Sequence, residues 1–336
     1  MIFRASWYLK LWIANFTVFL LNAGEEVLVG GQAVFEGVMM RTPRSYSIAV
    51  RKTDGSVAVK KDLLPRPADR KSLWGYPVIR GIATLGQAFT LGIRALKFSS
   101  DQILSNLNHR QKSGERAEET KEGREISNWL MTTNILIAIG FFILLFKVLP
   151  LLLTSWLKLH VKCLDNHFLF SLVDGLIRMG VFLLYIFLVS RLRDIRRMFE
   201  YHGAEHKVVF TFESHEPLSV SNAKKFSTLH PRCGTSFLMV VMLISTLVYA
   251  FIPFDSFLLK LLSRVVLIPF IAGISYEIIR FAALHKSRIL VLLTLPGLWL
   301  QRVTTKEPDD SQLEIAIRAL DDALLLEKSA PTLATV

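Results

Sequence analysis

Cysteine is nearly absent from the chain: Cys163 and Cys233 are the only two among 336 residues. Two cysteines cannot form the disulfide framework that holds many small secreted domains together. The fold must therefore be held by other interactions.

Acidic residues are few relative to basic ones: 28 Asp and Glu stand against 40 Lys and Arg, which gives a formal charge of +12. Such a balance is typical of proteins that contact nucleic acid or an anionic lipid surface. The basic residues of this chain flank its apolar blocks. We therefore expect the lipid bilayer as a partner and no nucleic acid.

Apolar residues, by contrast, are abundant: they make up 51% of the chain, and the mean hydropathy is +0.40. They form long blocks of about the 20 residues that a membrane-spanning helix requires. The blocks cover residues 134–156, 168–189, 235–253 and 261–283. The sequence therefore predicts an all-α polytopic membrane protein with about four transmembrane helices.

The loop between the second and third blocks, residues 191–234, is rich in Arg and Lys. The short loops on the other side hold little more than Lys158, Lys162 and Lys260. Because positive residues remain on the cytoplasmic side, we expect a multi-pass protein of the bacterial inner membrane with both termini in the cytoplasm. This topology separates Cys163 from Cys233 and leaves Cys233 reduced and available for chemistry.

The regions outside the membrane blocks suggest a small N-terminal domain. Residues 1–29 are an apolar extension. Its apolar run, residues 7–21, is too short to cross the membrane easily, and we expect an interfacial anchor rather than a signal peptide. Residues 30–105 combine a β-hairpin around Asp54-Gly55 with an amphipathic helix from Pro77 to about Asp101. The expected apolar face of that helix consists of Val78, Ile82, Leu85, Phe89, Ile93 and Leu96.

The remaining segments complete the expected organisation. Residues 106–130 form a polar, flexible linker, and 131–304 form the membrane domain. The apolar run 289–300 is interrupted by Pro296-Gly297, which indicates a re-entrant or interfacial segment. Residues 305–336 hold a C-terminal amphipathic helix and tail, and Ser311 and Glu314 have the spacing of a capping box.

The basic middle loop also carries the residues best suited to metal chemistry. In the segment YHGAEHK, His202 and His206 lie one helical turn apart, with Glu205 beside them, in the H-x-x-E-H pattern of inverted zincins. The segment HPRCGT adds His230 and Cys233. These side chains are enough for a tetrahedral site for Zn²⁺ or another divalent transition metal, with Glu205 as a ligand or a general base. The alternative is that they end helices and anchor the loop at the lipid headgroups.

Other charged residues are candidates for a role in or near the membrane. Asp174 and Arg178 lie four residues apart within the second block. Placing a charge at this depth in the membrane costs about 2.5–3.5 kcal/mol of insertion free energy. We therefore expect the two residues to form an ion pair or a functional site. Glu277 is placed to reach the His-rich loop from the fourth block. Glu36 follows Gly30-Gly31, which form either an anion-binding nest or a plain turn.

Taken in order, these motifs resemble the YqhQ-type family of bacterial membrane proteins. The resemblance covers Gly30 to about Leu326 and rests on GGQAVFEGVMMR, PVIRGI, YHGAEHK, HPRCGTSF, ISYEIIRF and PGLWLQRVTTKEPDDSQLEIAI. That family has a domain-of-unknown-function name and is described as a predicted metal-dependent enzyme. The resemblance implies a metal site at the matched His and Cys residues and makes Glu36 and Glu277 plausible members of it. It implies no substrate.

Three functions fit these features. The first is a metal-dependent, hydrolase-like membrane enzyme with Glu205 as general base, acting on a lipid-linked or membrane-protein substrate. The second is a non-enzymatic accessory or assembly factor for another membrane protein, with a structural metal site or none. The third is a small transporter that uses Asp174 and Arg178, and it is the weakest because the chain has no inverted repeats.

Overall fold

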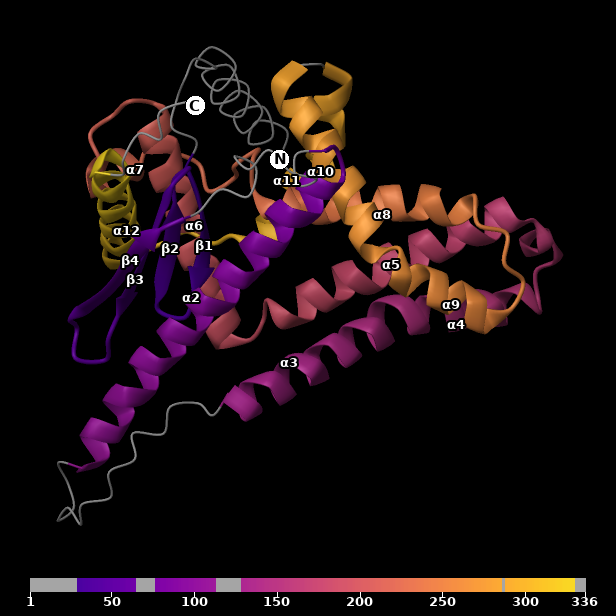
Figure 1. Ribbon diagram of the computed structural model, residues 1–336, viewed down its shortest axis with the longest axis horizontal. Coiled ribbons are helices and arrows are strands. Elements are labelled where there is room, and N and C mark those ends of the chain that lie inside the picture. The colour runs from indigo at the N-terminus through magenta and orange to yellow at the C-terminus, as the bar shows by residue number, and fades with distance from the viewer. Residues whose placement is uncertain (1–28, 65–75, 113–127, 286–287, 330–336) are drawn as a thin grey trace, which may run out of the picture.

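The computed structural model describes residues 29–64, 76–112, 128–285 and 288–329. Figure 1 shows a body on the left, in which a small sheet is covered by helices, and an arm of long helices that extends to the right. The strands are β1 (Gly30–Val34), β2 (Gly37–Arg41), β3 (Ser45–Arg51) and β4 (Val57–Leu63). The longer helical elements are α2 (Ile79–Lys112), α3 (Asn128–Ile143), η3 (Leu144–Val148), α4 (Leu149–Lys158), α5 (His167–Val189), α6 (Arg193–Glu213), α8 (Gly234–Ala250), α9 (Phe257–Val266), α10 (Ile268–His285), α11 (Arg288–Thr304) and α12 (Asp310–Ser329). The short ones are η4 (Lys162–Asp165) and α7 (Val220–Ala223).

The four strands form one antiparallel sheet in chain order. The hairpin predicted around Asp54-Gly55 is confirmed as β3 and β4, and Gly55 has a φ of 86° in its turn. Strands β1 and β2 were not predicted, because their segment was expected to form a nest or a plain turn. It forms a second hairpin instead, and Glu36 occupies its turn with a φ of 52°.

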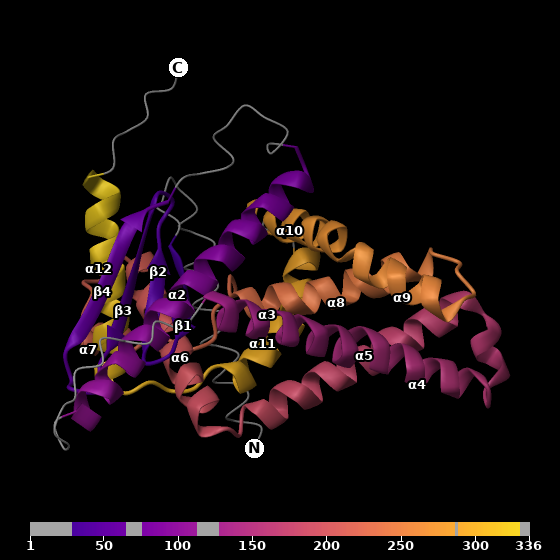
Figure 2. The ribbon, with the colours of Figure 1, turned by 60° about the horizontal axis from the view of Figure 1, so that its bottom comes forward.

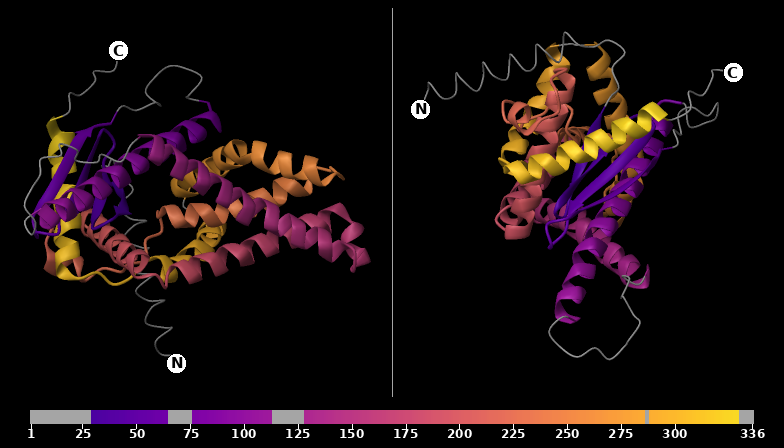
Figure 3. Two further views of the ribbon diagram at one scale, coloured as in Figure 1. Left: turned by 90° about the horizontal axis from the view of Figure 1, so that it is seen from below. Right: turned by 90° about the vertical axis from the view of Figure 1, so that its left-hand side faces the viewer.

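The sheet lies between helices on both faces, as the two views of Figure 3 show. Val38 and Met40 pack in a core shared with α6 and α12. Met39, which points to the opposite face, packs with Leu91 of α2. The expected apolar face of α2 is only partly right: Phe89 is 64% exposed, and Leu91 is the buried neighbour of the sheet. Helix α2 also continues past Asp101 to Lys112, so the start of the expected linker is helical.

The arm, which Figure 2 shows from a second direction, contains the helices that are apolar enough to be candidate membrane spans. Two continuous stretches are long and apolar enough to cross a membrane: Thr132–Lys158, which joins α3, η3 and α4, and α5. Helices α9 and α10 add a third if this pair, bent by 49°, counts as one span. Four spans were expected, and two to three meet the requirement among the described residues.

Local sequence explains why the last two expected spans fall short. Helix α8 has 17 residues and ends at Ala250, shortly before Pro253. The fourth block breaks at Leu267, and Pro269 then lies in the first turn of α10, where its missing N–H costs nothing. The apolar blocks are therefore present, but prolines divide them into shorter helices.

The two C-terminal helices also differ in detail from their expected form. Helix α11 continues through Pro296, so the break expected at Pro296-Gly297 is wrong. Helix α12 is the predicted amphipathic helix, and it lies across the sheet. Its capping box is formed by Asp309 and Gln312 rather than by the predicted Ser311 and Glu314. The backbone N–H of Gln312 donates to the Asp309 side chain (2.8 Å), and the backbone N–H of Asp309 donates to the Gln312 side chain (2.9 Å).

The expected apolar extension over 7–21 lies outside the described residues, as does most of the linker.

Candidate metal centre

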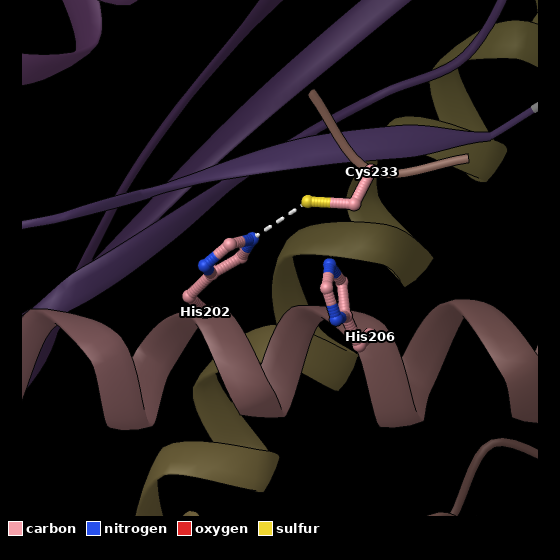
Figure 4. Close-up of side chains that lie close together, drawn as sticks. All are labelled: His202, His206 and Cys233. Carbon is pink, nitrogen blue, oxygen red and sulfur yellow. Dashed lines mark hydrogen bonds between the residues drawn. The ribbon is translucent and has the colours of Figure 1, made fainter. Parts of the chain in front are cut away.

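Three possible metal ligands come together where the arm joins the body. Helix α6 presents His202 and His206 one turn apart on one face, and Cys233 is the residue immediately before α8. Their ligand atoms all lie within 4.8 Å of one another. Figure 4 shows both rings and the Cys233 sulfur pointing toward a common centre.

Both histidine rings are oriented by backbone carbonyl groups. The Nδ1 of His202 lies 2.8 Å from the carbonyl oxygen of Thr304, and the Nδ1 of His206 contacts that of Thr228. A carbonyl oxygen only accepts, so each Nδ1 carries the proton and each Nε2 keeps a free lone pair. This arrangement is typical of metal-binding histidines, whose other ring nitrogen donates to a fixed acceptor.

The two Nε2 atoms face the inside of the cluster. The Nε2 of His202 lies 3.2 Å from the sulfur of Cys233. The Nε2 of His206 is buried and has no hydrogen-bond partner. A buried nitrogen without a partner is costly, and a metal ion at this position would satisfy it.

The donor set fits a divalent transition metal. Two imidazoles and a thiolate are typical ligands of Zn²⁺ and related ions, whereas Mg²⁺ and Ca²⁺ prefer oxygen. Ligands of one tetrahedral Zn²⁺ lie about 3.3–3.6 Å apart, given metal–ligand bonds of about 2.0–2.3 Å. A pair of ligand atoms at the 4.8 Å limit must therefore approach by about 1.2–1.5 Å to hold an ion, a movement within the range of side-chain rotation.

Glu205 borders the cluster on α6. One of its carboxylate oxygens lies 4.0 Å from the Nε2 of His202. The side chain is 9% exposed, and the Gly31 N–H of β1 donates to it. Burial raises the pKa of the Glu205 carboxyl, and the nearby His202 and His230 rings offset part of this rise.

Gly31 makes this contact between the sheet and Glu205 sterically feasible. A Cβ at Gly31 would lie 2.6 Å from the carbonyl oxygen of Met39 and 2.9 Å from the Cγ of Glu205. Gly31 therefore allows β1 to lie against α6.

His230 lies outside the group of three. Its ring is 5.6 Å from that of His206, centroid to centroid. The backbone N–H of Arg232 donates to its Nδ1 (3.2 Å), so its Nε2 carries the proton and faces Glu213 at 3.4 Å. Burial lowers the pKa of His230 to about 4, and the ring is therefore neutral at physiological pH.

The segment that carries His230 and Cys233 is attached to α11 by Gln301, which sequence reasoning did not identify. The Gln301 side chain is fully buried; it accepts from the His230 N–H (2.7 Å) and donates to the His230 carbonyl (2.8 Å). A Cβ at Gly297 would lie 2.4 Å from the Cα of Ser236, so α11 also packs directly on the start of α8. A polar residue within an otherwise apolar helix was the available signal for Gln301.

The other candidate residues have partners elsewhere. Glu36 forms a two-point ion pair with Arg197 of α6 and accepts from the Tyr201 hydroxyl (3.3 Å), so it positions α6 one turn before His202. Glu277 pairs with Arg80 of α2.

Asp174 and Arg178 form a buried ion pair (2.6 Å) in the first half of α5, the half more distant along the chain from α6 and its histidines. Arg264 of α9 makes a second ion pair with Asp174 (2.6 Å).

Comparisons with known proteins agree with one another. The model of a family described as "Protein of unknown function (DUF1385)" matches residues 76–325. The "Uncharacterized protein YqhQ" of Bacillus subtilis (strain 168) is 36% identical over 303 residues, which cover 89% of this chain and 92% of that protein. No solved structure matches the chain at a significant level.

Proposed function

The chain belongs to the DUF1385 family, and from this premise we propose that it is a membrane-embedded, metal-dependent enzyme with a His₂Cys centre. The observation that carries the proposal is the convergence of two lone-pair nitrogens and a sulfur, with both Nδ1–H groups held by backbone carbonyls. Zn²⁺ is the simplest occupant.

The number of ligands favours catalysis. Structural zinc sites use four protein ligands, whereas catalytic sites use three and leave one position open. Here His202, His206 and Cys233 make up the group, and the lone pair of His230 is occupied by the Arg232 N–H. When bound, the ion would act as a Lewis acid and make a water molecule more acidic.

Glu205 is then placed to act as general base in a hydrolase-like reaction. Its carboxylate lies beside the cluster, and its Cγ packs against Gly31 of β1. A base must lie within reach of the proton that it accepts, directly or through one water molecule.

The position of the centre points to a substrate at the membrane. The cluster lies where the sheet body meets the apolar arm, and α8 leads from Cys233 directly into that arm. We propose a lipid-linked or membrane-protein substrate, with the arm in the cytoplasmic membrane and both termini on the cytoplasmic side.

One observation favours the second function, an accessory factor with a structural metal site. Glu205 is buried and only 4.0 Å from the Nε2 of His202, so a small shift would make it the fourth ligand and close the site.

Substitution of Glu205 separates these two functions. If Glu205 is the base, the Glu205→Gln protein should retain full metal content and stability yet lose cellular function in a complementation assay. His206→Gln should lose both metal and function, because it removes a ligand. His160→Gln is the matched control, since His160 is exposed and remote from the cluster.

A Glu205→Gln protein that is stable, metal-replete and fully active would rule out the base and with it the catalytic proposal. A Glu205→Gln protein that loses metal in step with function would assign Glu205 as a ligand and favour the structural site.

A further inference from the structure

The far end of the arm contains a hollow lined by basic and polar side chains. It is shallow and open: its empty volume of about 230 Å³ includes open solvent, and the space within it admits only a group of about the size of a water molecule, such as a single phosphate oxygen. It lies among α5, α8 and α9, at the end of the arm opposite the sheet. Its polar lining consists of His167, Ser171, Tyr249, Lys260, Ser263 and Arg264.

The interior of the arm around this hollow carries more positive than negative charge. Asp174 accepts from both Arg178 and Arg264, so one carboxylate serves two guanidinium groups. The side-chain nitrogen of Lys147 is also buried and lies 3.3 Å from the Tyr249 hydroxyl. Buried charges are stable only when they are paired, so two buried guanidinium groups around one carboxylate leave a net positive charge that favours a bound anion.

Arg264 connects this charged interior to the hollow. Its side chain is 4% exposed and lines the hollow, while one guanidinium nitrogen is bound to Asp174. Lys260, one turn earlier on α9, contributes a second cation, and its ammonium lies over the Phe170 ring at 4.3 Å from the centroid. Among the described residues, no carboxylate lies within ion-pair distance of Lys260.

A third polar side chain lines the same hollow. The Nε2 of His167, a residue that lines the hollow, is buried and has no hydrogen-bond partner. An ammonium, a guanidinium and an imidazole from two helices thus line the same hollow. Arg and Lys together are typical of sites that recognise phosphate oxygens.

We propose that this hollow binds a phosphate-bearing anion, the headgroup of an anionic phospholipid. The adjoining surface of α9 favours a lipid over free phosphate, since Leu258 is 69% exposed and Leu262 is 55% exposed. These side chains offer an apolar surface to acyl chains next to the cations. The proposal rests on the membrane placement of the arm but not on the metal centre.

Thermal unfolding of the purified full-length protein in detergent tests this site. In phosphate-free buffer, dioctanoyl phosphatidylglycerol should raise the unfolding midpoint of the wild type, because a ligand that binds only the folded state stabilises it. Dioctanoylglycerol, which has the same chains without the phosphate, should raise it much less. Inorganic phosphate, added alone, shows whether the anion suffices without the chains.

Substitutions locate the effect. Lys260→Gln should lose most of the phosphatidylglycerol shift, and His167→Gln should lose part of it. Lys162→Gln is the matched control, because Lys162 is exposed on η4 and does not line the hollow. Arg264 is left intact, since its ion pair with Asp174 supports the fold.

Equal shifts with phosphatidylglycerol and dioctanoylglycerol, or equal responses of Lys260→Gln and Lys162→Gln, would overturn the proposal. An equal shift with inorganic phosphate alone would overturn the lipid assignment and identify free phosphate as the ligand. The thermal-unfolding measurement does not depend on metal content. A negative result would therefore not contradict the proposed metal centre.

Discussion

At the scale of single residues, the candidate centre depends on atoms that sequence spacing does not reveal. The spacing of His202 and His206 predicts correctly that the two rings share one face of a helix. It does not reveal the carbonyl groups of Thr228 and Thr304, which fix the rings. Backbone acceptors have no side-chain signature, so only the folded structure identifies them.

Gly203 gives a residue-scale prediction. A Cβ at this position would lie 2.0 Å from the carbonyl oxygen of Lys306, two residues after the Thr304 that orients His202. Gly203→Ala should therefore destabilise the protein by about 1–3 kcal/mol, the typical cost of overpacking, and should weaken metal binding as well.

The matched control is Gly86→Ala in α2, where an added Cβ meets nothing within 4 Å. It should be neutral or stabilise the protein by up to about 1 kcal/mol, because alanine favours helix over glycine. Chemical unfolding in detergent measures both variants. Equal stabilities would show that α6 does not pack closely on Lys306 at Gly203.

At the scale of secondary-structure elements, the segments with a strong local pattern were predictable. The long apolar stretches of α3–α4 and α5, the hairpin around Asp54-Gly55 and the amphipathic α12 were all evident. In each, the signal is carried by neighbouring residues: continuous hydropathy, a turn dipeptide or a stripe at helical spacing.

The elements that were not predicted are defined by tertiary contacts. Strands β1 and β2 lack the polar–apolar alternation of a surface strand, because α2 covers one face of the sheet while α6 and α12 cover the other. Helix α11 continues through Pro296. Its packing on α8 through Gly297 and the Gln301 hydrogen bonds supports that helix despite the proline.

At the scale of the whole molecule, the two candidate sites lie at opposite ends of α8. Cys233 precedes the first residue of this helix, and Tyr249 lies next to its last. A helix of 17 residues is about 25 Å long, which is a few ångströms short of the roughly 30 Å hydrocarbon core. If the arm crosses a membrane, the metal centre and the basic hollow therefore face opposite leaflets.

The two cysteines test this arrangement. Cys163 is exposed in η4 at the far end of the arm, and Cys233 is half-buried at the near end. In intact cells, a membrane-impermeant maleimide should label the wild-type protein at Cys163. The Cys163→Ser protein should be labelled only after the membrane is permeabilised. Labelling of Cys163→Ser in intact cells would place Cys233 outside and reverse the proposed topology.

The central claim is that His202, His206 and Cys233 hold one transition-metal ion, and Co²⁺ binding tests it most directly. Co²⁺ occupies zinc sites, and a bond from cobalt to a thiolate gives an intense near-ultraviolet absorption band. The Cys163→Ser protein, stripped of metal by chelation, should show this band on titration and saturate at about one ion per chain. Adding Cys233→Ser should abolish the band, and adding His206→Gln should weaken binding strongly. A titration with no thiolate–cobalt band in the Cys163→Ser protein, or with a band that persists after Cys233→Ser, would contradict the account.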